Sequence, residues 1–207
     1  MASGKTAVAW IKRSIFILAL LPLARLLWLG FTDRLGANPV EFIERSTGTW
    51  ALVGLLLSLA VTPLRLLSGW GWLLSLRRML GLFMFFYACL HFMAYLWLDH
   101  WFDWPEIAKD ILKHPYVLVG FLALILSVPL AATSNDAMMR KLGKRWKTLH
   151  ALSYPVAVLA VLHYLWLVKQ DISQPVTYAL ILLGLLSIRI AYRVRNKFKL
   201  INNQSTR

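Results

Sequence analysis

Six long apolar stretches constrain the fold of this chain more than any other feature of its sequence. They cover residues 14–31, 50–67, 79–98, 116–132, 149–168 and 176–191. Each is about 16 to 20 residues long, close to what a helix needs to cross roughly 30 Å of hydrocarbon. None shows the polar–apolar alternation of a barrel strand. We therefore predict an all-α polytopic membrane protein, folded as a single six-helix transmembrane bundle over residues 1–207.

The net charge of +14 raises the question of a nucleic-acid partner, so the placement of the charges decides its meaning. Basic residues gather before the first span, in the second and fourth connections and after the sixth span. The first and third connections are net acidic, and the fifth is neutral. Because positively charged connections stay in the cytoplasm, this alternation predicts that both termini are cytoplasmic. Topology accounts for the basicity, and we expect no nucleic-acid partner.

Three of the five histidines lie within predicted spans, where ionisable side chains are costly and usually mark a function. By helical rise, His91 lies roughly 18 Å and His163 roughly 21 Å from the cytoplasmic start of its span. Two imidazoles at one level on different helices can bind opposite faces of a haem. Zinc fits less well, because it prefers three or four clustered ligands. The alternative is that each ring donates a hydrogen bond to a neighbouring carbonyl or hydroxyl.

The third histidine, His150, lies about 20 Å below His163 by the same rise, a suitable depth for a second haem. In an ideal helix the two side chains would be about 140° out of phase, so their alignment requires either local rewinding, for which Pro155 is a candidate position, or a slanted haem arrangement. The third span has no histidine at this level. The residues therefore predict one haem and leave a second open.

Two basic clusters flank the predicted cytoplasmic surface near His150. One is the pair Arg77 and Arg78, and the other is the segment MMRKLGKRWK before the fifth span. They either bind an anionic cofactor, such as a flavin phosphate, or set the orientation and contact anionic lipid. On the opposite side, the acidic segment 99–110 is a candidate docking surface for a partner.

Several motifs resemble one family over nearly the whole chain. They are LGANPVEFI followed by TG, RRMLGL, HPY and, most specific, AMMRKLGKRWKTLHALSYPVAVLAVLHYLW. These motifs resemble the MsrQ (YedZ) family, the haem-binding membrane subunits of the periplasmic methionine sulfoxide reductase system. The resemblance extends to the ferric-reductase-like transmembrane group, which includes the NADPH oxidase cores.

The resemblance implies a six-helix bundle in the bacterial inner membrane, with haem b held by histidines on the third and fifth helices. His91, His150 and His163 match that pattern, whereas the second histidine of the NADPH oxidase third helix has no counterpart here. It further implies electron transfer from the quinone pool or a cytosolic flavin reductase to a periplasmic molybdopterin subunit, as a heterodimer that repairs oxidised periplasmic proteins. FMN is implied by the resemblance alone.

Two other functions compete with an electron-transfer subunit. One is a stand-alone transmembrane ferric or quinone reductase. The other is a transporter that uses the histidines as a proton relay. The sequence contains no G-x-G-x-x-G dinucleotide motif. Compared with the NADPH oxidases that it resembles, it also lacks the FAD and NADPH domain, so we expect that it does not oxidise a nicotinamide unaided and has no substrate-reducing site of its own.

Overall fold

The structure, a computed structural model, describes residues 2–205, in which all regular elements are helical. Six helices or helical segments among them are long and apolar enough to cross a membrane, which confirms the predicted all-α bundle. In chain order the elements are α1 (Ala2–Phe31), α2 (Pro39–Ser68), the 3-10 helix η1 (Gly71–Leu76), α3 (Arg77–Ala94), the π-helical turn η2 (Tyr95–Asp99), α4 (Trp104–Lys113), α5 (Pro115–Ala132), α6 (Asp136–Leu142), α7 (Lys144–His150), α8 (Ser153–Leu167) and α9 (Ser173–Ser205).

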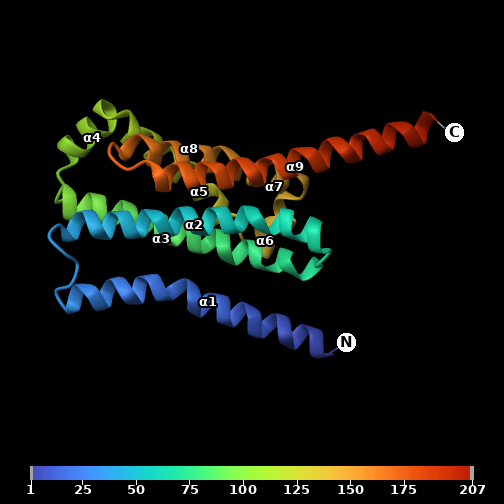
Figure 1. The fold of residues 1–207 in the computed structure, drawn as a ribbon, viewed down its shortest axis with the longest axis horizontal. Helices are drawn as coiled ribbons and strands as arrows, with labels where there is room; N and C mark the ends of the chain where they lie inside the picture. Colours follow the sequence, from blue (N-terminus) through green and yellow to red (C-terminus); the bar gives the residue numbers. More distant parts are fainter. Residues whose placement is uncertain (1, 206–207) are drawn as a thin grey trace.

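The bundle is built from two helical hairpins that pack against each other. Helix α2 packs most extensively on α3, and α5 packs most extensively on α8. Helix α9 closes the bundle against α2 and α8, whereas α1 lies at its edge with little contact (Figure 1). The start of α1 and the end of α9 project from the same end of the bundle (Figure 1).

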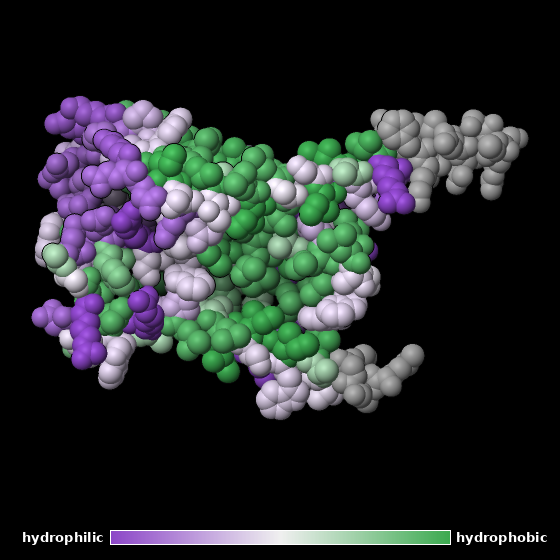
Figure 2. Space-filling model, in the orientation of Figure 1, coloured by the Kyte–Doolittle hydropathy of each residue, from purple (hydrophilic) through white to green (hydrophobic). Residues whose placement is uncertain are grey.

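A broad apolar band covers the middle of the face shown in Figure 2, as expected for surface that faces hydrocarbon. Hydrophilic residues gather at the end of the molecule where α4 lies (Figure 2). The buried core lies between α2, α3, α8 and α9 and is mainly aliphatic, with Leu55, Leu59 and Val156 at its centre. This core packs the α2–α3 hairpin against α8 and α9 and so fixes their relative positions.

Several helices extend beyond the apolar stretches that predict them. Helix α2 begins at Pro39, well before the predicted start at residue 50, because Asn38 caps it by accepting the Glu41 N–H at 3.3 Å. It ends at Gly69, whose left-handed φ of 74° suits glycine. Hydropathy detects the part of a helix that lies in hydrocarbon, whereas capping determines where the helix itself begins and ends.

The predicted fifth span, 149–168, consists of two helices. The chain turns at Ala151 and Leu152, between α7 and α8, and the Tyr154 N–H donates to the Ala151 carbonyl at 3.0 Å. Pro155 lies in the first turn of α8, where a missing N–H costs little. The break in the helix thus lies at Ala151 and Leu152, directly after His150 and before Pro155.

Candidate functional site

The two hairpins bring His91 of α3 and His163 of α8 together. Their ring centroids lie 6.1 Å apart, and the ring planes are inclined by 70°. The side chains come from helices on different hairpins, so the pair depends on the packing of the whole bundle. The two residues that helical rise assigns to nearly the same depth therefore lie side by side in the structure.

Each of these imidazoles is held by a backbone carbonyl of the other helix in its own hairpin. His91 Nδ1 lies 3.0 Å from the Glu44 carbonyl oxygen on α2. His163 Nδ1 lies 2.7 Å from the Tyr116 carbonyl oxygen on α5. Since a carbonyl can only accept, both Nδ1 atoms carry the proton and donate it. The hydrogen bond of the alternative interpretation is thus present, but it uses only one nitrogen of each ring.

The remaining nitrogens, Nε2 of His91 and Nε2 of His163, have no hydrogen-bond partner among the side chains of residues 6–196 or the backbone of residues 2–205. A neutral imidazole protonated at Nδ1 presents its Nε2 lone pair as a metal ligand, and the Nδ1 hydrogen bond fixes the ring in that state. The described part of the chain brings no group of three or more His, Cys, Asp or Glu side chains into position to hold a metal ion. The pair is therefore suited to a metal whose other ligands come from elsewhere.

His150 lies apart from this pair, at the end of α7. Its ring stacks on Trp146 with centroids 3.9 Å apart, and its Nε2 lies 3.0 Å from the Thr133 hydroxyl. That hydroxyl donates to the Pro129 carbonyl at 2.6 Å, so it accepts from His150 Nε2–H. His150 is consequently the opposite tautomer, with Nδ1 left as its free nitrogen.

The two predicted arginines stand at the start of α3 with different partners. Arg78 forms an ion pair with Asp136 of α6, and both side chains are exposed. Hydrogen bonding to the Arg78 guanidinium and its positive charge lower the pKa of Asp136 below its ordinary value. Arg77 is partly buried, and its carbonyl accepts from the Ser58 hydroxyl at 3.3 Å.

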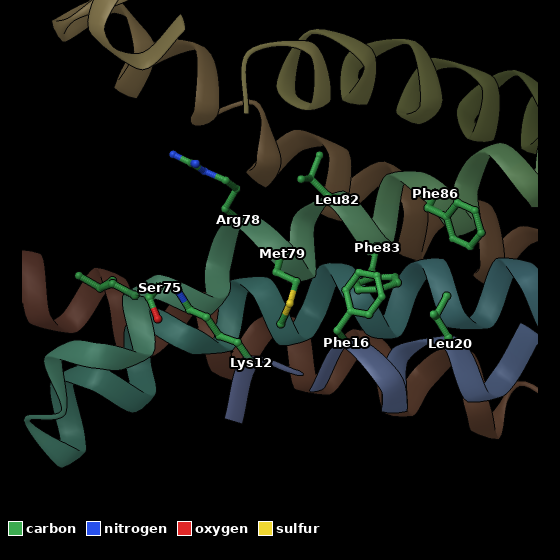
Figure 3. Close-up of a pocket in the computed structure, with 10 residues that line it drawn as sticks. Lys12, Phe16, Leu20, Ser75, Arg78, Met79, Leu82, Phe83 and Phe86 are labelled. Carbon is green, nitrogen blue, oxygen red and sulfur yellow. The ribbon is translucent and has the colours of Figure 1, made fainter. Parts of the chain in front are cut away.

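A groove of about 710 Å³ lies between α1 and the start of α3. Figure 3 shows Phe16 of α1 packed against Phe83 of α3, with ring centroids 5.1 Å apart, and Met79 and Lys12 beside them in the lining. Its walls are mostly apolar, and Lys12, Ser75 and Arg78 form the polar part of the lining. The sequence analysis did not identify this groove, because it arises from the loose packing of α1, which hydropathy does not report.

Sequence reasoning also missed the partners that orient the histidines. Glu44 and Tyr116 act through backbone carbonyls, which leave no signal in residue type. The detectable signal is indirect: a glycine follows each of them four positions later, at Gly48 and Gly120, inside an apolar helix.

The fold and the site define a polytopic helical membrane protein with a half-buried pair of histidines, one from each of two hairpins. Comparison with known proteins narrows this class. The family described as "Ferric reductase like transmembrane component" matches residues 47–161. No solved structure matches the chain.

Curated relatives match nearly the whole length. A protein of Herminiimonas arsenicoxydans is 53% identical over 192 residues, covering 90% of this chain and 88% of the relative. One from Bordetella pertussis is 50% identical over 187 residues, covering 89% and 91%. One from Rhodospirillum rubrum is 51% identical over 188 residues, covering 89% of each. All three are named protein-methionine-sulfoxide reductase heme-binding subunit MsrQ. This chain belongs to the MsrQ family, within the ferric-reductase-like transmembrane components.

Proposed function

We propose that the protein is a haem b electron-transfer subunit in which His91 and His163 are the axial ligands of one haem. The observation that carries the proposal is the 6.1 Å separation of their ring centroids. A metal–imidazole bond is about 2 Å, and a ring nitrogen lies roughly 1 Å from the ring centre, given ring bonds of about 1.3 Å. Two imidazoles on opposite sides of one iron thus have centroids about 6 Å apart, in agreement with the structure.

The chain's own contribution is to orient both rings and to fix which of their nitrogens carries a proton. The Nδ1 hydrogen bonds to the Glu44 and Tyr116 carbonyls fix the tautomer and make Nε2 a stronger donor. An iron with two imidazoles and a porphyrin is saturated, so it exchanges electrons and does not bind oxygen. This coordination favours an electron-transfer subunit over a catalytic reductase.

The route of the electrons is proposed from the topology and the relatives. The alternation of charged connections supports cytoplasmic termini and, with them, a position of the His91–His163 pair nearer the periplasmic face of the bacterial inner membrane. The relatives named as MsrQ support a periplasmic methionine sulfoxide reductase as the acceptor. We propose a molybdopterin-containing catalytic subunit, bound as a heterodimer, with the quinone pool or a cytosolic flavin reductase as donor.

Two further cofactor sites are proposed at the cytoplasmic end of the bundle. His150 is the proposed ligand of a second haem, which requires either its free Nδ1 or release of Nε2 from Thr133. Arg77 and Arg78 are the proposed contacts of an FMN phosphate, and Arg78 would share its charge with Asp136. These residues lie at the face where a cytosolic or membrane donor would deliver electrons.

Three histidine variants test the proposal. His91→Ala and His163→Ala are each expected to abolish the Soret band of the haem that the pair holds. His150→Ala should keep that haem, since His150 lies apart from the pair, and pyridine haemochromogen counting then shows whether a second haem is lost. His114→Ala, in the loop before α5, is the matched control and should retain full haem content. Retention of the full band in both His91→Ala and His163→Ala would overturn the assignment.

A further inference from the structure

Each histidine of the pair lies directly against a glycine of the neighbouring helix. A Cβ built on Gly48 of α2 would lie 3.2 Å from Nδ1 and Cε1 of His91. A Cβ on Gly120 of α5 would lie 2.7 Å from Nδ1 and 2.9 Å from Cε1 of His163. Real Cβ atoms essentially never come closer than 3.0 Å to such neighbours. Any side chain at residue 120 would therefore displace the imidazole or its helix.

These glycines are placed where they expose the carbonyls that the histidines use. Glu44 is four residues before Gly48, and Tyr116 is four residues before Gly120. In an α-helix a side chain leans towards the N-terminus and covers the preceding turn. A side chain at position i+4 therefore stands over the carbonyl of residue i. Glycine leaves that carbonyl open from the side, so an imidazole N–H reaches it in addition to the helix's own N–H.

The arrangement occurs twice with the same spacing. Donor and acceptor are 47 residues apart in the His91–Glu44 pair and again in the His163–Tyr116 pair. The two hairpins thus present their histidines by the same device, although the residues around the two glycines differ. Helix interiors disfavour glycine by roughly 1 kcal/mol relative to alanine. Two such positions, each against a ring of the same pair, point to a requirement of the site.

Other glycines show that this contact is not general. A Cβ built on Gly54 of α2 would lie 3.2 Å from backbone atoms of Met84, so this glycine serves the close approach of α2 and α3. A Cβ on Gly184 of α9 would meet nothing within 4 Å. Among the glycines with a tight neighbour, only Gly48 and Gly120 meet an imidazole in the described structure.

We propose that Gly48 and Gly120 are positioning residues for the histidine pair. Each leaves room for the imidazole to reach the backbone carbonyl that accepts the hydrogen bond from its Nδ1–H. That hydrogen bond sets the orientation and tautomer of the ring and the strength of its Nε2 as a metal ligand. The inference rests on the proposed haem ligation and adds to it the two residues, outside the ligands, on which ligand geometry depends.

The size of the effect expected for each glycine variant follows the distance from the added Cβ to the imidazole, 2.7 Å at Gly120 and 3.2 Å at Gly48. Gly120→Ala should weaken haem retention by about 10- to 100-fold, the usual range when a partner of a ligating histidine is lost. Gly48→Ala, with its larger clearance, should have a smaller effect in the same direction. Both should raise the haem midpoint potential, because an imidazole that no longer donates from Nδ1 is a weaker electron donor to ferric iron. The low-spin electron paramagnetic resonance signal should shift with the ring orientation.

Two control variants separate positioning from folding. Gly54→Ala has the same 3.2 Å clearance as Gly48→Ala, but against backbone. It should lower the unfolding temperature while leaving the potential and the resonance signal unchanged. Gly184→Ala should change none of these.

The measurements are transfer of haem to apomyoglobin, redox titration and electron paramagnetic resonance on the full-length protein. If Gly120→Ala does not fold, Gly48→Ala, compared with Gly54→Ala, makes the same test. Wild-type protein that binds no haem would overturn the proposed function itself. Wild-type protein with haem, and glycine variants that match Gly184→Ala in potential, signal and transfer rate, would overturn only the role of the two glycines.

Discussion

The guanidinium of Arg189 on α9 donates a hydrogen bond through Nη2 to the backbone carbonyl of Leu59 on α2. Leu59 lies four residues before Pro63, and proline has no N–H to bind that carbonyl. Arg189 is 7% exposed and Leu59 1%, so water does not replace the missing donor. Arg189 also donates through Nη1 to the Tyr154 hydroxyl at 2.6 Å. Arg189 thus supplies the hydrogen-bond donor that Pro63 lacks. Its two hydrogen bonds also connect α9 to α2 and α8.

This relationship predicts an energetic coupling between Arg189 and Pro63. Arg189→Leu leaves the Leu59 carbonyl unsatisfied and should cost about 1–3 kcal/mol of stability. In a Pro63→Ala background the helix supplies its own N–H, so the same substitution should cost markedly less. Denaturant unfolding in detergent of the four proteins of this cycle measures the difference. An equal cost in both backgrounds would show that the carbonyl is not what Arg189 serves.

The bundle itself could be predicted from the sequence, because the length and hydropathy of a membrane span are set by the bilayer. For example, residues 116–132 were predicted and α5 covers Pro115–Ala132. The polar ends of the helices could not be predicted in this way, since the starts of α2 and α9 depend on capping and helix propensity outside hydrocarbon. Helix α4 lies in a polar connection that no apolar stretch marks.

The histidines of the site could be predicted, because ionisable residues are rare in membrane spans. Helical rise places His91 and His163 at one level, and the structure brings their rings together. The hydrogen bonds that turn the rings end on backbone carbonyls, which every residue has. The position of His150 depends on the turn at Ala151 and Leu152, whose location Pro155 indicates only approximately.

The ion pair of Arg78 with Asp136 predicts a pH-dependent attachment of α6 to α3. Because the pKa of Asp136 is lowered, its stabilising effect is present above the ordinary value of 3.8 and is lost as the pH falls through the lowered pKa. Hydrogen exchange of the α6 amides should therefore be slower in wild type than in Asp136→Asn at pH 7. The difference should disappear in acid, after correction for intrinsic exchange, and should shrink at high salt because both side chains are exposed. Equal exchange in the two proteins at pH 7 and low salt would contradict the role of the ion pair.

The acidic segment 99–110, a candidate docking surface by sequence, is committed in part to internal contacts. Asp110 is the centre of these contacts, with a side chain only 19% exposed. It accepts from the Tyr95 hydroxyl at 2.7 Å and from His114 Nδ1 at 2.6 Å, and His100 Nε2 lies 3.7 Å away. Asp103 caps α4 by accepting the Glu106 N–H at 3.1 Å. The acidic side chains Asp103 and Asp110 therefore serve mainly to cap α4 and to hold it against the end of α3.

Asp110→Asn should accordingly destabilise α4. An amide oxygen accepts more weakly than a carboxylate, and its NH2 group faces donors, so one of the Tyr95 and His114 contacts is lost at a cost of about 1–3 kcal/mol. The expected result is faster hydrogen exchange over Trp104–Lys113 and a lower unfolding temperature, with the haem spectrum unchanged. Lys109→Gln, on an exposed neighbouring position, is the control and should alter neither. Should Asp110→Asn keep wild-type exchange in α4 while losing coupled turnover with the periplasmic subunit, the carboxylate would be a docking residue instead of a structural one.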